Sequence, residues 1–317
     1  MPSSNAPPAG PCDVLKLPGG AGRVRPAHPL AHPMAGSALA MLFQPGVVEL
    51  PTPDMPGYDS GQFLTVLGDD DRERRTDTDQ PPLRAICSLW MEDATGLAMI
   101  GTGFLVGRRT VMTCAHNLLK HDFTASRVTV RPGREAGRSS DPFGAHVVTA
   151  ADWWMHPEWS NGWKAQHDFA LLRLPEPVGE TTGWLGIAAL SGPTIAARMV
   201  NLAGYPGCVG RCRHLDDENV IPVRERGAQL WWQRDRILRT DADQLFYDLD
   251  TFGGNSGSPV ILMPIEGDGW SGPTAVGIHT RGLNKWGDAH EAAHNTATRL
   301  TDALFDLALD FLAKHDG

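Results

Sequence analysis

Short apolar runs bounded by glycine or proline recur along most of this chain, and they constrain its fold more than any other feature. The 317 residues include 35 glycines and 25 prolines. Apolar runs of about four to eight residues between such turn residues are typical of β-strands. Because sustained helical periodicity is scarce, the pattern favours an all-β architecture. Clear examples of these runs are 84–90, 101–107, 110–113 and 169–174.

The strand-like runs fall into two groups. A segment containing several prolines and glycines separates them at 175–192. We therefore predict one β-barrel over about residues 82–175 and a second over about 190–298, since the chain is long enough for two small barrels that share one core region. After them comes an apolar stripe with helical spacing, which predicts a helix over about 300–314. The stripe consists of Leu300, Leu304, Leu307 and Phe311.

The segment Gly253-Gly-Asn-Ser-Gly-Ser-Pro259 places Ser256 among glycines. A serine hydroxyl becomes a nucleophile when a neighbouring base takes its proton, and the oxyanion that it then creates needs preorganised N–H donors. Gly254 and Gly257 allow the backbone to turn sharply and to present such donors. On its own, a cluster of this kind is most often a simple loop.

Two distant stretches supply the other groups of such a site. The run Thr110–Thr113 leads through Cys114 to His116, and Asp168 opens the apolar run 169–174. A histidine at the end of a strand is held rigidly and still faces a cleft, as a general base must. The chain therefore carries the three groups in the order histidine, aspartate, serine.

This order and the three motifs resemble those of the trypsin-like serine proteases. The likeness is strongest with the bacterial glutamyl endopeptidase or V8-like branch, in which the serine motif also reads Gly-Asn-Ser-Gly-Ser-Pro and a Gly-Ile-His follows, here Gly277-Ile-His279. It extends from about residue 70 to about residue 312. The resemblance implies a chymotrypsin-like domain over 69–317, with two Greek-key six-stranded antiparallel β-barrels and a C-terminal helix.

The resemblance implies a serine endopeptidase that uses a catalytic triad. His116 would take the proton of Ser256, and the alkoxide would attack a peptide carbonyl to form an acyl-enzyme that water then hydrolyses. Asp168 would orient the ring of His116. The backbone N–H groups of Gly254 and Ser256 would form the oxyanion hole. No cofactor is expected, and no metal ion is expected at the site.

The resemblance also implies a set of substrate-binding residues. In glutamate-specific members, the positions that match His279 and Thr251 contact the substrate carboxylate, and a histidine that can donate a hydrogen bond or carry charge suits that task. Arg281 would add positive potential nearby. The strand Thr280-Arg-Gly282 would pair with the substrate backbone as an added β-strand.

Asp250 opposes this interpretation of the pocket. It lies six residues before Ser256, where trypsins place the aspartate that selects lysine or arginine, and a carboxylate there would repel a glutamate side chain. Several bacillary glutamate-specific enzymes share the motif, however, so Asp250 can point away. We expect a preference for Glu or Asp before the cleaved bond. The alternatives are a Lys or Arg preference set by Asp250, and a latent or inactive protease-like binding module.

The first 68 residues hold about half of the prolines and show no sustained periodicity, so we expect an extended or partly disordered extension rather than a folded domain. One interpretation is a propeptide or inhibitory arm that lies along the active-site cleft, and the other is a flexible tail. We favour the first, because a protease that is not exported must be restrained. The charged run 69–78 is typical of a solvated linker, but it resembles the mature N-terminal region of V8-like enzymes, which places a processing point near it.

The cysteines do not predict a disulfide framework, because their number is odd and they are sparse. Cys114 is interpreted as a small buried hydrophobe beside the site. Cys208 and Cys212 are interpreted as free thiols in a loop, although a bridge or a metal pair is the alternative. The full set is Cys12, Cys87, Cys114, Cys208 and Cys212.

The net charge is −9 and the pI is about 5.7, which argues against nucleic acid or an anionic membrane as the main partner. We expect a protein or peptide substrate as the partner, and the oligomeric state is left open. The N-terminus lacks the basic and apolar regions of a secretory signal, so a soluble, cytoplasmic protein is expected. Relatives of the branch are exported, which leaves a different start site or a non-standard export route as the alternative.

Overall fold

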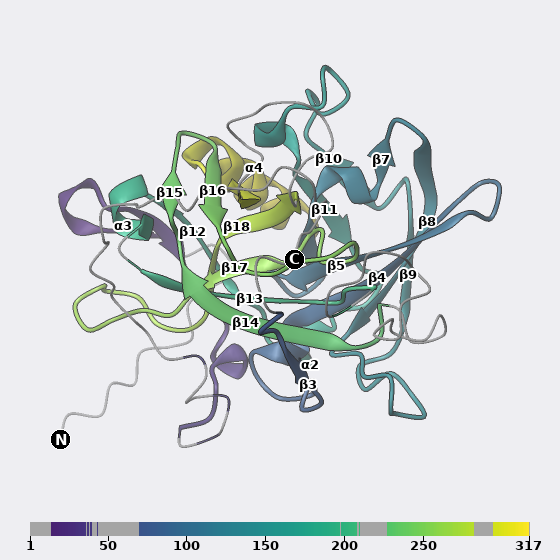
Figure 1. The fold of residues 1–317 in the computed structure, drawn as a ribbon, viewed down its shortest axis with the longest axis horizontal. Helices are drawn as coiled ribbons and strands as arrows, with labels where there is room; N and C mark the ends of the chain where they lie inside the picture. The colour runs from purple at the N-terminus through teal and green to yellow at the C-terminus, as the bar shows by residue number, and fades with distance from the viewer. Residues whose placement is uncertain are drawn as a thin grey trace.

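The computed structural model describes residues 14–35, 37, 39, 43, 70–196, 198–207, 209, 227–281 and 294–316. The expected all-β architecture is confirmed, since the described chain forms two curled sheets of eight and eleven strands (Figure 1). Within these described residues, helical structure is limited to short segments and one longer C-terminal helix. No helix among these residues is long and apolar enough to cross a membrane.

The eight-stranded sheet forms from the first group of apolar runs and lies to the right in Figure 1. Its order is β10-β11-β6-β5-β4-β8-β7, with β9 beside β8, and neighbouring strands are antiparallel. Its strands are β4 (Ile86–Asp93), β5 (Ala98–Leu105), β6 (Thr110–Thr113), β7 (Leu119–Lys120), β8 (Phe123–Pro132), β9 (His146–Thr149), β10 (Trp153–Met155) and β11 (Ala170–Arg173).

The eleven-stranded sheet forms mainly from the second group of runs and lies to the left and lower centre of Figure 1. Its pairings are antiparallel except that β12 and β18 are parallel. Its strands are β1 (Leu15–Lys16), β2 (Gly22–Arg25), β3 (Glu73–Arg75), β12 (Gly186–Leu190), β13 (Met199–Gly204), β14 (Leu230–Arg236), β15 (Arg239–Thr240), β16 (Gln244–Tyr247), β17 (Pro259–Leu262), β18 (Thr274–Arg281) and β19 (Asn295–Arg299).

Both sheets carry more than the six strands expected for each barrel. Short strands such as β7 and β9 add to the first sheet, and β1, β2 and β3 from the N-terminal side add to the second. Between and around the strands lie short helical segments. These are η1 (Pro18–Gly20), η2 (Pro29–Ala31), η3 (Leu83–Ala85), η4 (Ala115–Asn117), η5 (Ala165–His167), α2 (Gly179–Thr182) and α3 (Gly192–Ala196).

One hydrophobic core joins the two sheets. Leu89 and Leu171 of the first sheet belong to one buried cluster. The same cluster contains Trp232 and Ile278 of the second sheet and Tyr205, which follows β13. Burial of each large apolar side chain stabilises the fold by about 1.5–3 kcal/mol. The loops that meet at this junction are therefore held from both sides.

The N-terminal arm, residues 14–35, departs from the expectation that the extension is not folded. Strand β2 pairs antiparallel with β12, with Val24 opposite Ala188. Val24 and Ala31 are fully buried. The strand Gly22–Arg25 forms because β12 offers an unpaired edge and because Val24 fills the core beneath it.

Charged side chains fasten the N-terminal arm to three other parts of the fold. The guanidinium of Arg23 donates to Asp302 at 2.8 Å and to Asp306 at 2.7 Å on the C-terminal helix. Arg25, which is buried, donates to the carbonyl of Val106. Among the contacts of the described residues, none joins the arm to His116, Asp168 or Ser256. The inhibitory arm stays a prediction, because residues 1–13, 36, 38, 40–42 and 44–69 lie outside the described residues.

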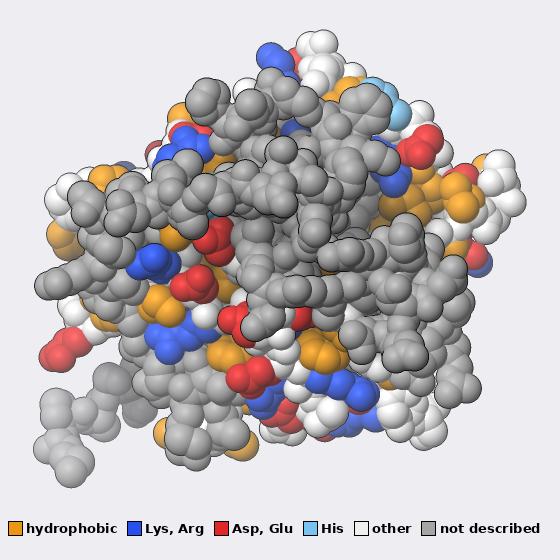
Figure 2. Space-filling model, in the orientation of Figure 1, with side chains coloured by type: hydrophobic (Ala, Val, Ile, Leu, Met, Phe, Trp, Pro, Cys, Tyr) orange, Lys and Arg blue, Asp and Glu red, His pale blue; other side chains and the backbone are white. Residues whose placement is uncertain are grey.

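The charged run is described from residue 70, and its residues 73–75 form a strand of the second sheet rather than a solvated linker. Strand β3 pairs with β14, and its arginines form ion pairs. Arg74 lies 2.6 Å from Glu135, and Arg75 lies 2.8 Å from Asp77. Asp70 and Arg72 form a nearly buried pair at 2.6 Å. Figure 2 shows acidic and basic side chains interspersed on the lower part of the face that carries β3 and β14.

The C-terminal helix α4 (Asp302–His315) confirms the predicted apolar stripe. Leu304 and Phe311 are buried, and Thr301 caps the first turn by accepting from the N–H of Leu304. The helix ends at Asp316, a buried residue whose carboxylate accepts from the N–H groups of Arg108 and Arg109, each at 2.7 Å. The helix thereby anchors the turn that leads into β6.

Candidate active site

His116 and Asp168 meet because β6 and β11 are adjacent strands. The two strands pair with Thr113 opposite Ala170. His116 follows β6 in the short helix η4, and Asp168 precedes β11 at the end of η5. The sequence places both residues next to strand ends, and the antiparallel register brings those ends together.

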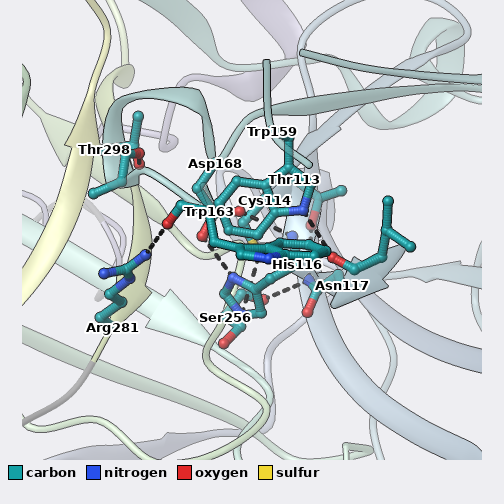
Figure 3. A network of polar contacts seen from close by, with 12 residues as sticks. Thr113, Cys114, His116, Asn117, Trp159, Trp163, Asp168, Ser256, Arg281 and Thr298 are labelled. Atoms are coloured by element: carbon teal, nitrogen blue, oxygen red, sulfur yellow. Dashed lines mark hydrogen bonds and ion pairs between the residues drawn. The ribbon is translucent and has the colours of Figure 1, made fainter. Parts of the chain in front are cut away.

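Asp168 holds His116 by two hydrogen bonds. One carboxylate oxygen lies 2.7 Å from Nδ1 of the ring, and the other accepts from the backbone N–H of His116 at 2.9 Å (Figure 3). Asp168 is fully buried, whereas the side chain of His116 is 20% exposed. Burial is the largest single influence and opposes protonation of His116, but the charge and hydrogen bond of Asp168 together with those of Cys114 outweigh it and raise the pKa of His116 well above 6.5.

Ser256 lies in a loop whose backbone conformation requires glycine at two positions. Gly254 and Gly257 have φ angles of +107° and +92°. A Cβ on Gly257 would overlap the carbonyl oxygen of Thr102, and one on Gly254 would lie 2.5 Å from the carbonyl oxygen of Tyr205. The loop therefore packs directly on the backbone of neighbouring segments.

Two groups of the first sheet fix the backbone of Ser256. Its carbonyl oxygen accepts from the N–H of Thr102 at 2.8 Å and from the side-chain amide of Asn117 at 2.9 Å. Asn117 follows His116 directly in the chain (Figure 3). The same turn thus positions the candidate base and the candidate nucleophile.

The backbone N–H groups of Gly254 and Ser256 are free to bind an oxyanion. Within the part of the chain that the structure describes, neither donates to a protein acceptor. By contrast, the N–H of Gly257 is used by the carbonyl of His279 at 2.8 Å, and that of Asn255 by the carbonyl of Phe252 at 2.9 Å. The two donors at positions 254 and 256 are thus unused where the sequence predicts the oxyanion hole, which stays a prediction.

His116 and Ser256 are neighbours, but their side chains are not hydrogen bonded to each other among the described contacts. The nearest polar atom recorded at Nε2 of His116 is instead Sγ of Cys114, at 3.6 Å. Cys114 is fully buried, and burial raises the pKa of its thiol, as the interpretation of this residue as a small buried hydrophobe requires. Catalytic hydrogen bonds are often long in the free enzyme and tighten when substrate binds.

Asp250 is buried and faces partners other than a substrate. One of its carboxylate oxygens accepts from the N–H of Asp71 at 3.3 Å, and the side-chain amide of Gln233 lies 3.5 Å from the same oxygen. Gln233 also accepts from the N–H of Asp250. These contacts tie the carboxylate to the segment that precedes β3.

His279 on β18 is buried, and its Nδ1 lies 2.7 Å from the hydroxyl of Tyr247. Burial and, to a smaller extent, the charge of His116 lower the pKa of His279 to about 3. His279 is therefore neutral at physiological pH. Of the two modes that the sequence analysis allows for this ring, hydrogen bonding and charge, the structure favours hydrogen bonding.

Two buried threonines next to the site have hydroxyl groups without a hydrogen-bond partner among the described residues. They are Thr251, which is 1% exposed, and Thr280, which is 4% exposed. Unpaired buried hydroxyls are unfavourable by about 1–3 kcal/mol each, unless a bound molecule pairs with them. Arg281 lies on the same strand as Thr280 and donates to the carbonyl of Trp163 at 2.8 Å (Figure 3). Gly282 lies outside the described residues, as do Cys12, Cys208 and Cys212.

Sequence reasoning missed several residues that shape this site. Asn117 and Thr102 hold the backbone of Ser256, and Tyr247 holds the ring of His279. The position of Asn117 directly after the histidine is the one sequence signal that points to it. Thr102 lies in the apolar run 101–107 and Tyr247 lies 32 residues before His279, and neither residue type signals this role in the sequence.

Comparison with known proteins gives one family match and several relatives. The model of the trypsin-like peptidase domain matches residues 101–263. Glutamyl endopeptidase of Bacillus licheniformis is 30% identical over 244 residues, which cover 76% of this chain and 67% of that protein. A Bacillus subtilis protein named extracellular metalloprotease is 27% identical over 247 residues, which cover 77% of this chain and 69% of that protein.

A solved structure of a Glu endopeptidase in complex with MPD has a similar fold. The TM-score is 0.59 at 22% identity, and the match covers 78% of this chain and 99% of that chain. The likeness confirms the chymotrypsin-like arrangement of the two sheets and the C-terminal helix that the motifs implied.

Proposed function

The chain belongs to the trypsin-like peptidase family and is a serine-type endopeptidase, and from that premise we propose that it cuts peptide bonds after glutamate or aspartate through a triad of Ser256, His116 and Asp168. The observation that carries the triad is the pair of hydrogen bonds that Asp168 accepts from the ring and the backbone of His116.

The proposed mechanism begins with proton transfer from the Ser256 hydroxyl to Nε2 of His116. Asp168 keeps the other ring nitrogen protonated and stabilises the imidazolium that forms. The serine oxygen attacks the peptide carbonyl, and the N–H groups of Gly254 and Ser256 bind the oxyanion; each such donor lowers the barrier by about 3 kcal/mol. His116 then gives its proton to the leaving amine, and water hydrolyses the acyl-enzyme by the reverse roles.

Three features support the preference for an acidic side chain. The carboxylate of Asp250 is engaged by Gln233 and by the N–H of Asp71, so it is turned toward those partners. The hydroxyl of Thr251 is buried without a partner and is suited to a substrate carboxylate. The third feature is Arg281, which carries a positive charge two residues after His279 on β18. In addition, the Bacillus licheniformis relative is named glutamyl endopeptidase.

A peptide-library digest read by mass spectrometry tests the proposal. Digests by the full chain and by its Ser256→Ala variant are compared, and the bonds cut only by the former are aligned on the residue before the cut. We expect Glu and Asp at that position. Cuts after Lys or Arg would assign the pocket to Asp250, and an absence of cutting by a properly folded chain would favour a latent binding module.

A matched pair of variants then separates the two pocket candidates. Thr251→Val removes a hydroxyl with little change of shape, and we expect it to lower kcat/KM for a glutamate substrate by about tenfold, a loss of roughly 1.4 kcal/mol. Asp250→Asn should leave the ratio of glutamate to lysine cleavage unchanged. A marked gain in glutamate cleavage by Asp250→Asn would show that its charge faces the substrate.

A further inference from the structure

A thiol lies beside the ring nitrogen that the proposed mechanism uses as its base. Sγ of Cys114 is 3.6 Å from Nε2 of His116, and one ligand atom each from Cys114, His116 and Asp168 all lie within 4.8 Å of one another. Across the described ranges, this is the one set of three or more Cys, His, Asp or Glu side chains gathered so closely. Peptide hydrolysis by a serine triad does not need the thiol.

The separation of sulfur and nitrogen fits one metal ion between them. Zn²⁺ binds cysteine sulfur at about 2.3 Å and histidine nitrogen at about 2.0–2.1 Å in a tetrahedral arrangement, which places the two ligand atoms about 3.5–3.6 Å apart. The observed separation is 3.6 Å. The two atoms therefore stand at the spacing of zinc ligands without any rearrangement of the backbone.

Asp168 completes the surroundings that such an ion requires. Zinc-bound histidines usually donate their second ring N–H to a carboxylate, which fixes the tautomer and directs the free lone pair at the metal. The carboxylate of Asp168 lies 2.7 Å from Nδ1 of His116, which leaves Nε2 available as the ligand. The ring is 20% exposed, so water from the cleft can fill the remaining coordination positions.

We propose that Sγ of Cys114 and Nε2 of His116 form a binding site for Zn²⁺ or a similarly thiophilic divalent ion, and that this ion switches the peptidase off. On binding, the thiol and the protonated fraction of the His116 ring lose their protons to solvent, and the thiolate and the imidazole nitrogen become ligands. Nε2 then has no lone pair left to accept the proton of Ser256. The metal site stands independently of the proposed function, whereas the inhibition rests on it. Mg²⁺ and Ca²⁺ prefer oxygen ligands and should not bind here.

Binding is measured first, in a form that does not depend on activity. The full-length Ser256→Ala variant is reduced, freed of metal, and titrated with Co²⁺ and then Zn²⁺ while the thiolate-to-cobalt absorption band is followed. We expect a band that Zn²⁺ abolishes and that is missing when Cys114→Ala is added. Cys87→Ala is the matched control, because Cys87 is also fully buried but donates toward the carbonyl of Ala85, and it should keep the band.

Two further variants keep the binding test decisive. Cys114→Ser is used beside Cys114→Ala, so that a loss of folding in one does not imitate a loss of the ligand. A double variant, Cys208→Ser with Cys212→Ser, should retain the band. A band that survives both Cys114 variants, or that disappears in the double variant, would overturn the site.

Inhibition is measured second, on the active full chain with a peptide substrate. We expect micromolar-range or tighter Zn²⁺ to stop cleavage reversibly, EDTA to restore it and Mg²⁺ to have no effect. The Zn²⁺ concentration for half inhibition should rise at least about tenfold in Cys114→Ala, each variant being compared with its own metal-free rate. Equal inhibition of Cys114→Ala, or Cys114-dependent binding with no inhibition, would overturn the switch. A chain without peptidase activity would contradict the proposed function while the cobalt titration still decides the site.

Discussion

The two halves of the candidate site are held together in different ways. The first sheet brings His116 and Asp168 into direct side-chain contact, with two hydrogen bonds and a charge that raises the pKa of the ring. Ser256, which precedes β17 of the second sheet, is instead fixed through its backbone by Thr102 and Asn117. The base is thus tuned by electrostatics, while the nucleophile is positioned by packing and backbone geometry.

This difference teaches where each half is sensitive. A change at Asp168 should alter chemistry and leave the fold largely intact, because the loss is one of charge at a single ring. A change in the Ser256 loop should alter position and stability together, because the loop rests on the carbonyl oxygens of other segments. Variants of Asp168 and of the Ser256 loop test this contrast between electrostatics and packing.

Asp168→Asn should give the largest loss of activity. The amide cannot hold the required tautomer of His116 or stabilise its protonated form, and we expect kcat to fall by about 10⁴-fold with little change of KM. Single-turnover kinetics measure the rate of the chemical step, and circular dichroism measures whether the variant is folded. A variant that loses activity only because it unfolds would contradict the assignment of an electrostatic role.

Gly257→Ala should combine a large loss of stability with a loss of activity. A positive φ of +92° and overlap with the carbonyl oxygen of Thr102 oppose any side chain there, and we expect destabilisation by about 3 kcal/mol or more. Gly253→Ala is the matched control, because a Cβ at that glycine meets no atom within 4 Å. Denaturant unfolding compares the two, and equal stability would refute the packing argument for this half.

Asn117→Ala tests the link between the halves. It removes one of two donors to the carbonyl of Ser256 and also the contact with the hydroxyl of Thr113 at 2.9 Å. We expect about 1–2 kcal/mol of destabilisation and roughly a tenfold loss of kcat. Asn161→Ala, which removes an exposed hydrogen bond to Glu158, should change stability by less than about 0.5 kcal/mol. An unaltered kcat in Asn117→Ala would mean that the hydrogen bond from Thr102 alone positions the backbone of Ser256.

The contrast also explains how much the sequence could predict. His116, Asp168 and Ser256 stand in recognisable motifs at strand ends, so local pattern and order led to both sheets and to the site. The roles of Thr102 and Asn117 depend on how one sheet sits against the other, which local pattern does not encode. Gly22-Arg-Val-Arg25 has a single apolar residue, and its strand exists only because β12, over 160 residues later, offers an edge. The role of Asp250 is ambiguous in the sequence because its partners, Gln233 and Asp71, precede it by 17 and 179 residues and stand in no shared motif.

The pH dependence should show the smallest effect, and it reports on the electrostatic half alone. His116 accepts a proton only when neutral, and its pKa lies well above 6.5, with Asp168 among the causes. We therefore expect kcat/KM in EDTA-containing buffer to be still rising with pH at pH 7. A raised pKa in the folded state stabilises the protein below the unfolded value of about 6.5, and this contribution is lost as the pH rises through the folded pKa. Asp168→Asn should therefore move the rising limb of its residual activity to lower pH. Gly257→Ala should leave the limb where it is. If the rising limb of the pH profile moves in Gly257→Ala and not in Asp168→Asn, packing rather than charge sets the basicity of His116.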